Sequence, residues 1–271
     1  MPDEKDSLWE GFRSQDLFSD DDAESLSETV PVNQIPSSLA ENRRILEILF
    51  LIDVSGSMRG QRIAQVNYAL ESIFKELNRR DDADSAIKIG IMEFSDEARW
   101  ITPQPVPLED HVFTQITVQP WVTNYAKAFD LLDQKLSKKE FMNPNRGEYF
   151  APLILLITDG EPVDAEEYPK ALERLRHNGW FRQSAKYAVA VGEEARNEEI
   201  AHVLSEFTGL KQNVRYADEG EALCDLIEYI AVRASEVQTS LVSSSFDQQR
   251  DPDSIFGDVD ASLFSSMLQN E

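Results

Sequence analysis

The chain has 271 residues and is strongly acidic, with 50 Asp and Glu residues against 26 Lys and Arg residues and a formal net charge of −24. This charge argues against a nucleic-acid partner, because binding to a phosphate backbone depends on basic patches. The sequence contains no run of about 18 apolar residues, which argues against a membrane-spanning helix.

Both ends of the chain carry a large share of the negative charge. Residues 1–42 contain 11 acidic and 2 basic residues, and residues 242–271 contain 6 acidic residues and 1 basic residue. Such segments have little apolar surface to bury, so we expect both to be largely disordered. The sequence therefore predicts one folded domain over residues 43–241, which is long enough to bury a sizeable core.

Pairs of an aliphatic and an aromatic residue recur in these acidic ends. The four quartets that contain them are Asp6-Ser7-Leu8-Trp9, Gln15-Asp16-Leu17-Phe18, Asp253-Ser254-Ile255-Phe256 and Ala261-Ser262-Leu263-Phe264. An exposed aromatic side chain gains nothing unless a partner buries it. We therefore interpret the quartets as docking motifs for a groove with a basic rim, or as carboxylate donors to a metal site. Packing against the chain's own domain and chance are the alternative explanations.

The first predicted strand ends in a group of oxygen-bearing side chains. Residues 45–52 are nearly all apolar, which is typical of a central strand covered on both faces. Asp53, Ser55 and Ser57 follow, and the glycine between the two serines permits a tight turn that brings them together. Oxygen ligands without His or Cys favour a hard cation such as Mg²⁺ over zinc. A helix cap is the alternative role for Ser57, because a helical pattern begins two residues later.

Apolar segments and helical patterns alternate over the rest of the domain. Further strands are predicted at residues 86–94, 153–158 and 187–191, with an antiparallel edge strand at residues 99–101. Helical spacing of apolar residues occurs at residues 63–73, 126–132, 172–175 and 223–230. This alternation of strands and helices predicts an α/β fold with a mostly parallel central sheet and helices on both faces. Asp53 and Asp159 would then lie at the C-terminal ends of strands, where open α/β sheets bind ligands.

Three motifs stand at the predicted strand and helix ends: Asp53-Val-Ser55-Gly-Ser57, VTNYAKAF with Thr123, and LILLITDGEP with Asp159. Together they resemble the metal-ion-dependent adhesion site of von Willebrand factor A domains, over roughly residues 43–241. The segments ITDGEP, IKIGIMEFSDEA and AVAVGEE resemble more closely the bacterial tellurite-resistance-type von Willebrand A proteins. The resemblance implies a Rossmann-like von Willebrand A fold.

The resemblance also implies a set of metal ligands, with Mg²⁺ as the ion and Mn²⁺ as the alternative. Ser55 and Ser57 would contact the ion directly, Thr123 directly or through water, and Asp53 and Asp159 largely through waters. An acidic residue of a partner protein would complete the shell. The family usually has two glycines before the threonine, whereas this chain has Pro-Trp-Val, which stiffens the loop. A helix N-cap is an equally good interpretation of Thr123 from the sequence.

The function implied is that of a non-enzymatic, Mg²⁺-dependent adaptor in a bacterial stress-response or defence system of tellurite-resistance type, with a kinase or phosphatase as its partner. The alternative is a hydrolase that uses a Mg²⁺-bound water, with Glu161 as a base. No P-loop, no haloacid-dehalogenase-type second aspartate and no recognisable Ser-His-Asp triad supports catalysis. A third hypothesis leaves the metal site empty and assigns binding to the acidic ends.

The expected location is the cytoplasm. The chain has a single cysteine, Cys224, in an apolar helical pattern, and its first residues do not resemble a signal peptide. A protein of this kind suits a reducing compartment, without disulfide bonds and without a membrane partner.

Overall fold

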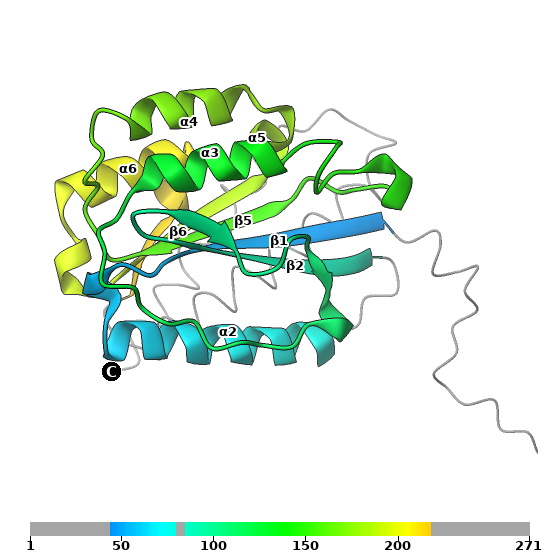
Figure 1. The fold of residues 1–271 in the computed structure, drawn as a ribbon, viewed down its shortest axis with the longest axis horizontal. Helices are drawn as coiled ribbons and strands as arrows, with labels where there is room; N and C mark the ends of the chain where they lie inside the picture. The colour runs from blue at the N-terminus through cyan, green and yellow to red at the C-terminus, as the bar shows by residue number, and fades with distance from the viewer. Residues whose placement is uncertain (1–43, 80–84, 218–271) are drawn as a thin grey trace, which may run out of the picture. The chain divides into compact units, whose positions relative to one another are not determined.

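The computed structural model describes residues 44–79 and 85–217, and Figure 1 shows their arrangement. The two acidic ends with their four quartets, Cys224 and the helical pattern at residues 223–230 lie outside the described residues. The domain boundaries at residues 43 and 241 therefore stay predictions.

A single mixed sheet forms the centre of the domain. Its strands are β1 (Arg44–Asp53), β2 (Ser85–Phe94), β3 (Ala98–Trp100), β4 (Val106–Pro107), β5 (Leu153–Thr158), β6 (Ala185–Val191) and β7 (Val214–Ala217). The strand order is β3-β2-β1-β5-β6-β7, and β4 pairs with β2 beside β3. Strands β2, β1, β5, β6 and β7 run parallel, whereas β3 and β4 are antiparallel to β2. The mostly parallel sheet and its antiparallel edge strand β3 are thus confirmed, while β4 and β7 were not predicted.

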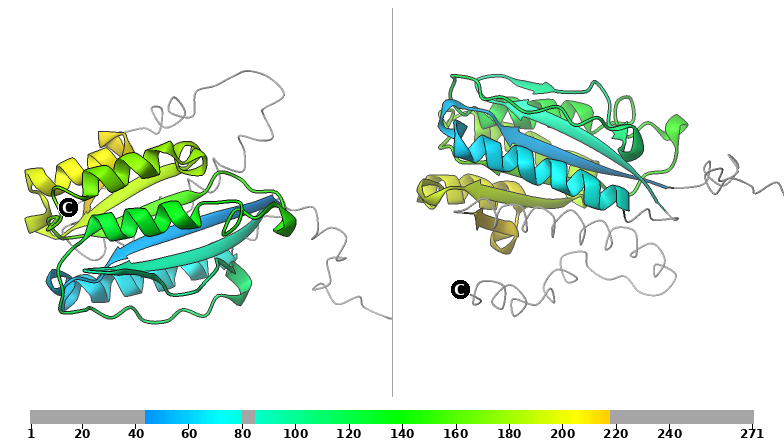
Figure 2. Two further views of the ribbon diagram at one scale, coloured as in Figure 1. Left: turned by 45° about the horizontal axis from the view of Figure 1, so that its top comes forward. Right: turned by 90° about the horizontal axis from the view of Figure 1, so that it is seen from below.

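Helices cover both faces of this sheet, as predicted. The α-helices are α2 (Gln61–Arg79), α3 (Tyr125–Lys135), α4 (Tyr168–His177), α5 (Gly179–Gln183) and α6 (Glu198–Thr208). Short 3₁₀ turns lie at η3 (Gly56–Met58), η4 (Leu108–Asp110), η5 (Pro144–Arg146), η6 (Glu193–Ala195) and η7 (Lys211–Asn213). Within the described residues, α2 lies on one face and α3 to α6 lie on the other (Figures 1 and 2). None of the helices in these ranges is long and apolar enough to cross a membrane.

Strand β1 is the centre of the sheet, and its nearly unbroken apolar sequence follows from that position. Every residue from Ile45 to Asp53 is buried. Leu46, Ile48, Phe50 and Ile52 pack in the core shared with α2, and alternate residues pack in the core on the side of α3, α4 and α6. A strand covered on both faces needs apolar side chains at both sets of positions.

Glu47 interrupts this apolar strand near its first residues. Its side chain is buried, and its Oε2 atom has no hydrogen-bond partner among the described residues. Burial raises the pKa of Glu47 to about 8, although the positive charges of Lys88 and Arg146 act in the opposite direction. Lys88 is the direct neighbour of Glu47 on β2. At neutral pH the carboxyl group is therefore largely protonated.

We predict that Glu47 makes the domain less stable as the pH rises. The pKa of Glu47 is higher in the folded chain than the ordinary value of 4.5, so the folded state binds the proton more tightly. The free energy of unfolding should then fall between about pH 5 and pH 8, by roughly 2–4 kcal/mol from this one group. Urea unfolding at pH 5, 6.5 and 8 measures the slope, and Glu47→Gln should flatten it. An equal slope in the two proteins would contradict this prediction.

Candidate metal centre

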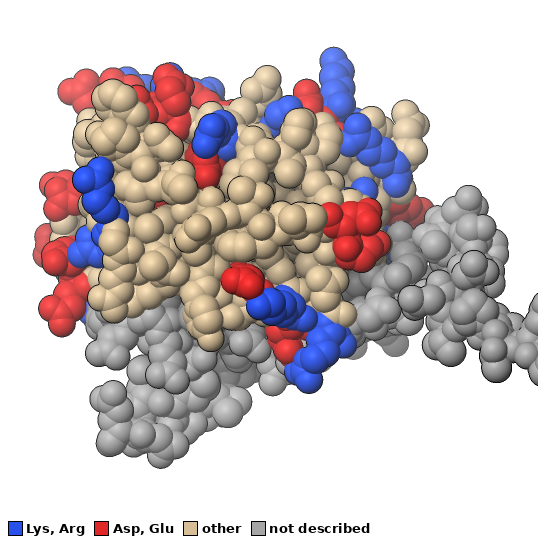
Figure 3. Space-filling view, turned by 60° about the horizontal axis from the view of Figure 1, so that its bottom comes forward, with Lys and Arg blue, Asp and Glu red and all other residues tan. Residues whose placement is uncertain are grey.

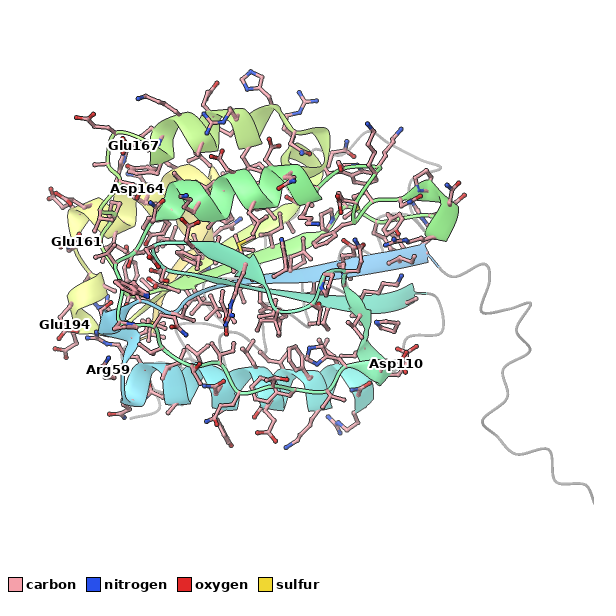
Figure 4. All side chains as sticks on the ribbon, viewed as in Figure 1. Arg59, Asp110, Glu161, Asp164, Glu167 and Glu194 are labelled. Carbon is pink, nitrogen blue, oxygen red and sulfur yellow. The ribbon has the colours of Figure 1, made fainter. Side chains whose placement is uncertain are left out.

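The candidate site lies at the edge of the sheet where the parallel strands end. Asp53 is the last residue of β1, and Asp159 directly follows β5, its neighbour in the sheet. Figure 4 shows this end of the domain, where the labelled Glu161 and Glu194 also lie. Acidic side chains gather at the same left-hand end in Figure 3, with basic side chains between them. Both aspartates therefore lie where open α/β sheets bind ligands, as the sequence predicts.

The Asp53 carboxylate is completely buried and is held by three hydrogen-bond donors. Its Oδ1 atom accepts a hydrogen bond from the backbone N of Ser55 (2.8 Å), and its Oδ2 atom accepts from the hydroxyls of Thr158 (2.6 Å) and Thr123 (3.2 Å). Burial raises the pKa of Asp53 to about 6, although the bonds from Thr158 and Ser55 favour the charged form. A nearby divalent cation would supply the positive charge that this carboxylate lacks.

The two serines extend this network to the second aspartate. The Oγ atoms of Ser55 and Ser57 lie 3.0 Å apart, and the hydroxyl of Ser57 donates to Oδ1 of Asp159 (2.7 Å). Ser57 lies inside the 3₁₀ turn η3, whereas α2 begins only at Gln61. The alternative role of Ser57 as the cap of that helix is therefore wrong. Its hydroxyl is directed at the site instead.

Thr123 also lies at the site rather than at a helix cap. The N-cap of α3 is Asn124, whose side chain accepts a hydrogen bond from the backbone N of Lys127 (3.1 Å). The N-cap interpretation of Thr123 is thus wrong. The loop before α3 lacks the family's glycines, and backbone hydrogen bonds hold it in place. Trp121 O accepts a hydrogen bond from Gly56 N (2.8 Å), and Thr123 O accepts one from Val163 N (3.1 Å).

Arg62, in the first turn of α2, provides a fixed positive charge beside Asp159. Its Nη1 atom donates to Oδ2 of Asp159 (2.6 Å) and to Ser57 O (3.1 Å), and its Nη2 atom pairs with Glu194. Gly192 has a positive φ of 89°, and a Cβ atom there would lie 2.9 Å from Nε of Arg62. Burial raises the pKa of Asp159, while Ser57 and Arg62 act to lower it. No local pattern in the sequence points to Arg62, because Asp159 is 97 positions away.

Three further residues hold the loops of the candidate site in place. A Cβ atom on Gly160 would lie 2.3 Å from Oγ1 of Thr123, so only glycine fits there. The hydroxyl of Tyr125 donates to Gly160 O (2.7 Å), and the carboxylate of Asp164 accepts from the backbone N of Tyr125 (3.2 Å) and of Ala126 (2.6 Å). The glycine of the motif ITDGEP points to a role for Gly160 at the site, whereas nothing in the sequence identifies Tyr125 or Asp164 as site residues.

The side chains present fit a hard divalent cation. Ser55, Ser57, Thr123 and Asp159 line an open hollow of about 500 Å³, and Asp53 lies beneath it, bonded to Thr123. In the described ranges, no group of three or more His, Cys, Asp and Glu could hold a metal ion. The groups that could bind a metal ion here are instead three hydroxyls and two carboxylates, which matches the preference of Mg²⁺ and Mn²⁺ for oxygen ligands.

Glu161, the candidate base of a hydrolase, lies on the rim of the hollow. Its side chain is exposed, and its Oε1 atom accepts a hydrogen bond from Nδ2 of Asn197. Its position on the rim is one from which it would face a partner bound at the hollow.

Comparison with known proteins places this chain in a family. The family model described as von Willebrand factor type A domain matches residues 47–228. Among curated proteins, the chain is 25% identical over 199 residues to inter-alpha-trypsin inhibitor heavy chain H4 of Bos taurus, and 28% identical over 183 residues to that of Sus scrofa. The aligned regions cover 72% and 65% of this chain. The chain spans only about a fifth of the length of these relatives, 21% and 19%.

Solved structures of the same fold include a pilus adhesin and a byssus protein. SpaC from Lactobacillus rhamnosus GG has a TM-score of 0.54 and 12% identity, with 73% of this chain and 30% of that chain covered. Proximal thread matrix protein 1 from the mussel byssus, in a structure with a zinc-occupied MIDAS motif, has a TM-score of 0.51 and 14% identity. That match covers 71% of this chain and 46% of the byssus protein.

Gly160→Ala is predicted to destabilise the domain at the site. The added methyl group would overlap the hydroxyl of Thr123, so the loop must shift, at a cost of roughly 1–3 kcal/mol. The matched control is Gly179→Ala, because a Cβ atom there meets nothing within 4 Å. Thermal unfolding of the two variants measures the difference. Equal midpoints would contradict the close approach of Gly160 and Thr123.

Arg62→Met is predicted to make the domain depend on a divalent cation for its stability. The side chain of Asp159 is only 1% exposed, so loss of Arg62 leaves a buried carboxylate without its positively charged partner and with the hydrogen bond from Ser57, at a cost of about 1–3 kcal/mol. Mg²⁺ should then raise the midpoint of thermal unfolding more in the variant than in the unchanged protein. Arg59→Met, at an exposed neighbour, is the control. An identical response to Mg²⁺ in Arg62→Met and the unchanged protein would rule this out.

Proposed function

Because the chain belongs to the von Willebrand factor type A domain family, we propose that it is a non-enzymatic adaptor that binds an acidic residue of a partner protein through a Mg²⁺-dependent adhesion site. The observation that carries the proposal is the convergence of three hydroxyls and two carboxylates at one edge of the sheet. These side chains come from three separate loops, and they form one continuous hydrogen-bonded network. The open hollow above them leaves room for a group supplied by a partner.

Each side chain has a definite part in this proposal. The hydroxyls of Ser55, Ser57 and Thr123 would hold the ion, and the carboxylates of Asp53 and Asp159 would hold it largely through waters. The ion, Mg²⁺ or Mn²⁺, supplies an open coordination position for an anionic oxygen. The chain's own residues orient the ligands, since Thr158 and Arg62 already hold the two carboxylates in place.

The cellular setting belongs to the proposal as well. The resemblance of ITDGEP, IKIGIMEFSDEA and AVAVGEE to tellurite-resistance-type proteins supports a bacterial stress-response or defence role, with a kinase or phosphatase as the partner. This part rests on those sequence segments alone. The single cysteine of the chain supports the cytoplasm as the location.

Variants of the ligands are predicted to weaken metal binding. Ser57→Ala removes a direct oxygen, and Asp53→Ala removes a carboxylate that orients the site, so we expect Asp53→Ala to lower the affinity for Mg²⁺ by about 10–100-fold. Ser205→Ala, on α6 and away from the hollow, is the matched control. Isothermal titration calorimetry measures the affinity, and thermal unfolding in EDTA checks that the variants fold. Unchanged affinity in Asp53→Ala would refute the metal centre.

The adaptor function is tested by purifying the tagged chain from its native host in Mg²⁺ and in EDTA, with Asp53→Ala alongside. We expect a partner that is present only with Mg²⁺ and an intact Asp53. A partner that is indifferent to both would contradict a metal-dependent adaptor. Turnover of a phosphoester that requires Mg²⁺ and Asp53 would instead establish the hydrolase alternative.

A further inference from the structure

Exposed apolar side chains surround the candidate metal centre. Within the described residues, five large apolar side chains are more than half exposed. Three of these line the hollow, namely Trp121 (55% exposed), Val122 (51%) and Val163 (58%). We call these three residues the apolar rim. Exposed apolar groups that gather around a polar site indicate a surface that a partner covers.

The apolar rim is held by the same hydrogen bonds that position the metal ligands. Trp121 O accepts a hydrogen bond from the backbone N of Gly56, which lies between the two ligand serines (2.8 Å). The backbone N of Val163 donates to Thr123 O (3.1 Å). A ligand that places an oxygen on the metal therefore meets a fixed apolar surface directly beside it.

The charges around the hollow select the kind of ligand. Among the residues of the described ranges that line it, Arg62 is the only Lys or Arg, while Glu161 and Glu194 lie on the rim with exposed side chains. A run of acidic residues would be repelled by these two glutamates. A single carboxylate followed by apolar side chains meets the metal and the apolar rim and avoids this repulsion.

The chain's own sequence contains a segment with this chemistry. Within residues 253–256, Asp-Ser-Ile-Phe, the carboxylate lies two positions before an aliphatic and three before an aromatic side chain, and Asp251 and Asp258 flank the segment. In extended backbone these four residues span roughly 10 Å between the first and last Cα atoms, which suits a hollow of about 500 Å³ and its rim. The quartet at residues 261–264 also ends in an aliphatic and an aromatic residue but contains no acid.

We propose that the 253–256 segment binds across the metal centre of its own chain, with the carboxylate of Asp253 directed to the metal and Ile255 and Phe256 against the apolar rim. The proposal rests on the proposed metal-dependent function, because the carboxylate needs the ion. The segment occupies the position of a partner's acidic residue, so a partner has to displace it. A tethered segment competes at an effective concentration in the millimolar range.

The length of the chain allows this contact. The last described residue, Ala217, accepts a hydrogen bond from the backbone N of Gly192, which abuts Arg62 at the site. The domain predicted from the sequence continues to residue 241, and Asp253 follows 12 positions after that boundary. At full extension those 12 positions cover about 40 Å, whereas a domain of this size has a radius of gyration of roughly 15 Å.

The test uses the full chain labelled for nuclear magnetic resonance, with Mn²⁺ as the probe, because this paramagnetic ion broadens the signals of nearby nuclei. We expect Mn²⁺, but not Mg²⁺, to remove most of the signal intensity of Ser55 and Gly160 at the site and of residues 253–256. Broadening at the site with sharp signals from residues 253–256 would overturn the inference and leave the metal centre intact. No broadening at Ser55 and Gly160 would refute the metal centre itself. Broadening of residues 6–9 in place of 253–256 would assign the surface to the other Asp-Ser-aliphatic-aromatic quartet.

Three variants separate docking from adventitious binding of Mn²⁺ to the acidic ends. In Asp53→Ala the signals of residues 253–256 should stay sharp, and persistent broadening there would overturn the inference. Phe256→Ala should restore these signals, while Phe264→Ala, in the quartet without an acid, should not.

The apolar rim is tested by Trp121→Ala, with Tyr68→Ala as the matched control. Both side chains are exposed, and Tyr68 does not line the hollow. Trp121→Ala should restore the signals of residues 253–256 and leave Ser55 and Gly160 broadened. Equal behaviour of the two variants would exclude the apolar rim as the docking surface.

Discussion

The buried carboxylate of Asp53 is the constraint on which the site depends. A charge removed from water is costly unless hydrogen bonds compensate for it, and here the compensation comes from one backbone amide and two hydroxyls. These donors belong to the turn after β1, the loop before α3 and the last residue of β5. The hydrogen bonds to this one carboxylate therefore hold three separate segments together at the edge of the sheet. Ser57 and Asp159, the other two side chains of the candidate site, stand on two of these segments and bond to each other.

Much of the fold could be predicted, because its central strands are covered on both faces. That environment requires unbroken apolar runs, so β1 and β5 were located to within one residue. The short strands β4 and β7 carry half-buried residues and leave no such pattern. The convergence of Asp53, Ser55 and Ser57 follows from local spacing. The position of Arg62 does not, because its carboxylate partner comes from a distant part of the chain.

The domain separates a rigid binding face from the elements that support it. The hydroxyls and carboxylates stand on the ends of buried strands, and Arg62 and Tyr125 reach them from the first turns of helices packed on opposite faces of the sheet. Such a site is organised before any ligand arrives, and binding energy is not spent on arranging it. The exposed residues around the hollow then decide which partner binds, because only their contacts can distinguish one partner from another.

The hydrogen bond from Thr158 to Asp53 has a consequence for how the protein is made. The two residues are 105 positions apart, so the ribosome adds more than a hundred residues after Asp53 before the donor exists. Until then the apolar residues of β1 have no strand β5 to pair with, and parallel pairing of distant segments is slow to form. The nascent domain therefore passes through an interval in which β1 can pair with β2 on one edge but lacks β5 on the other, and that open edge is a target for a chaperone during synthesis.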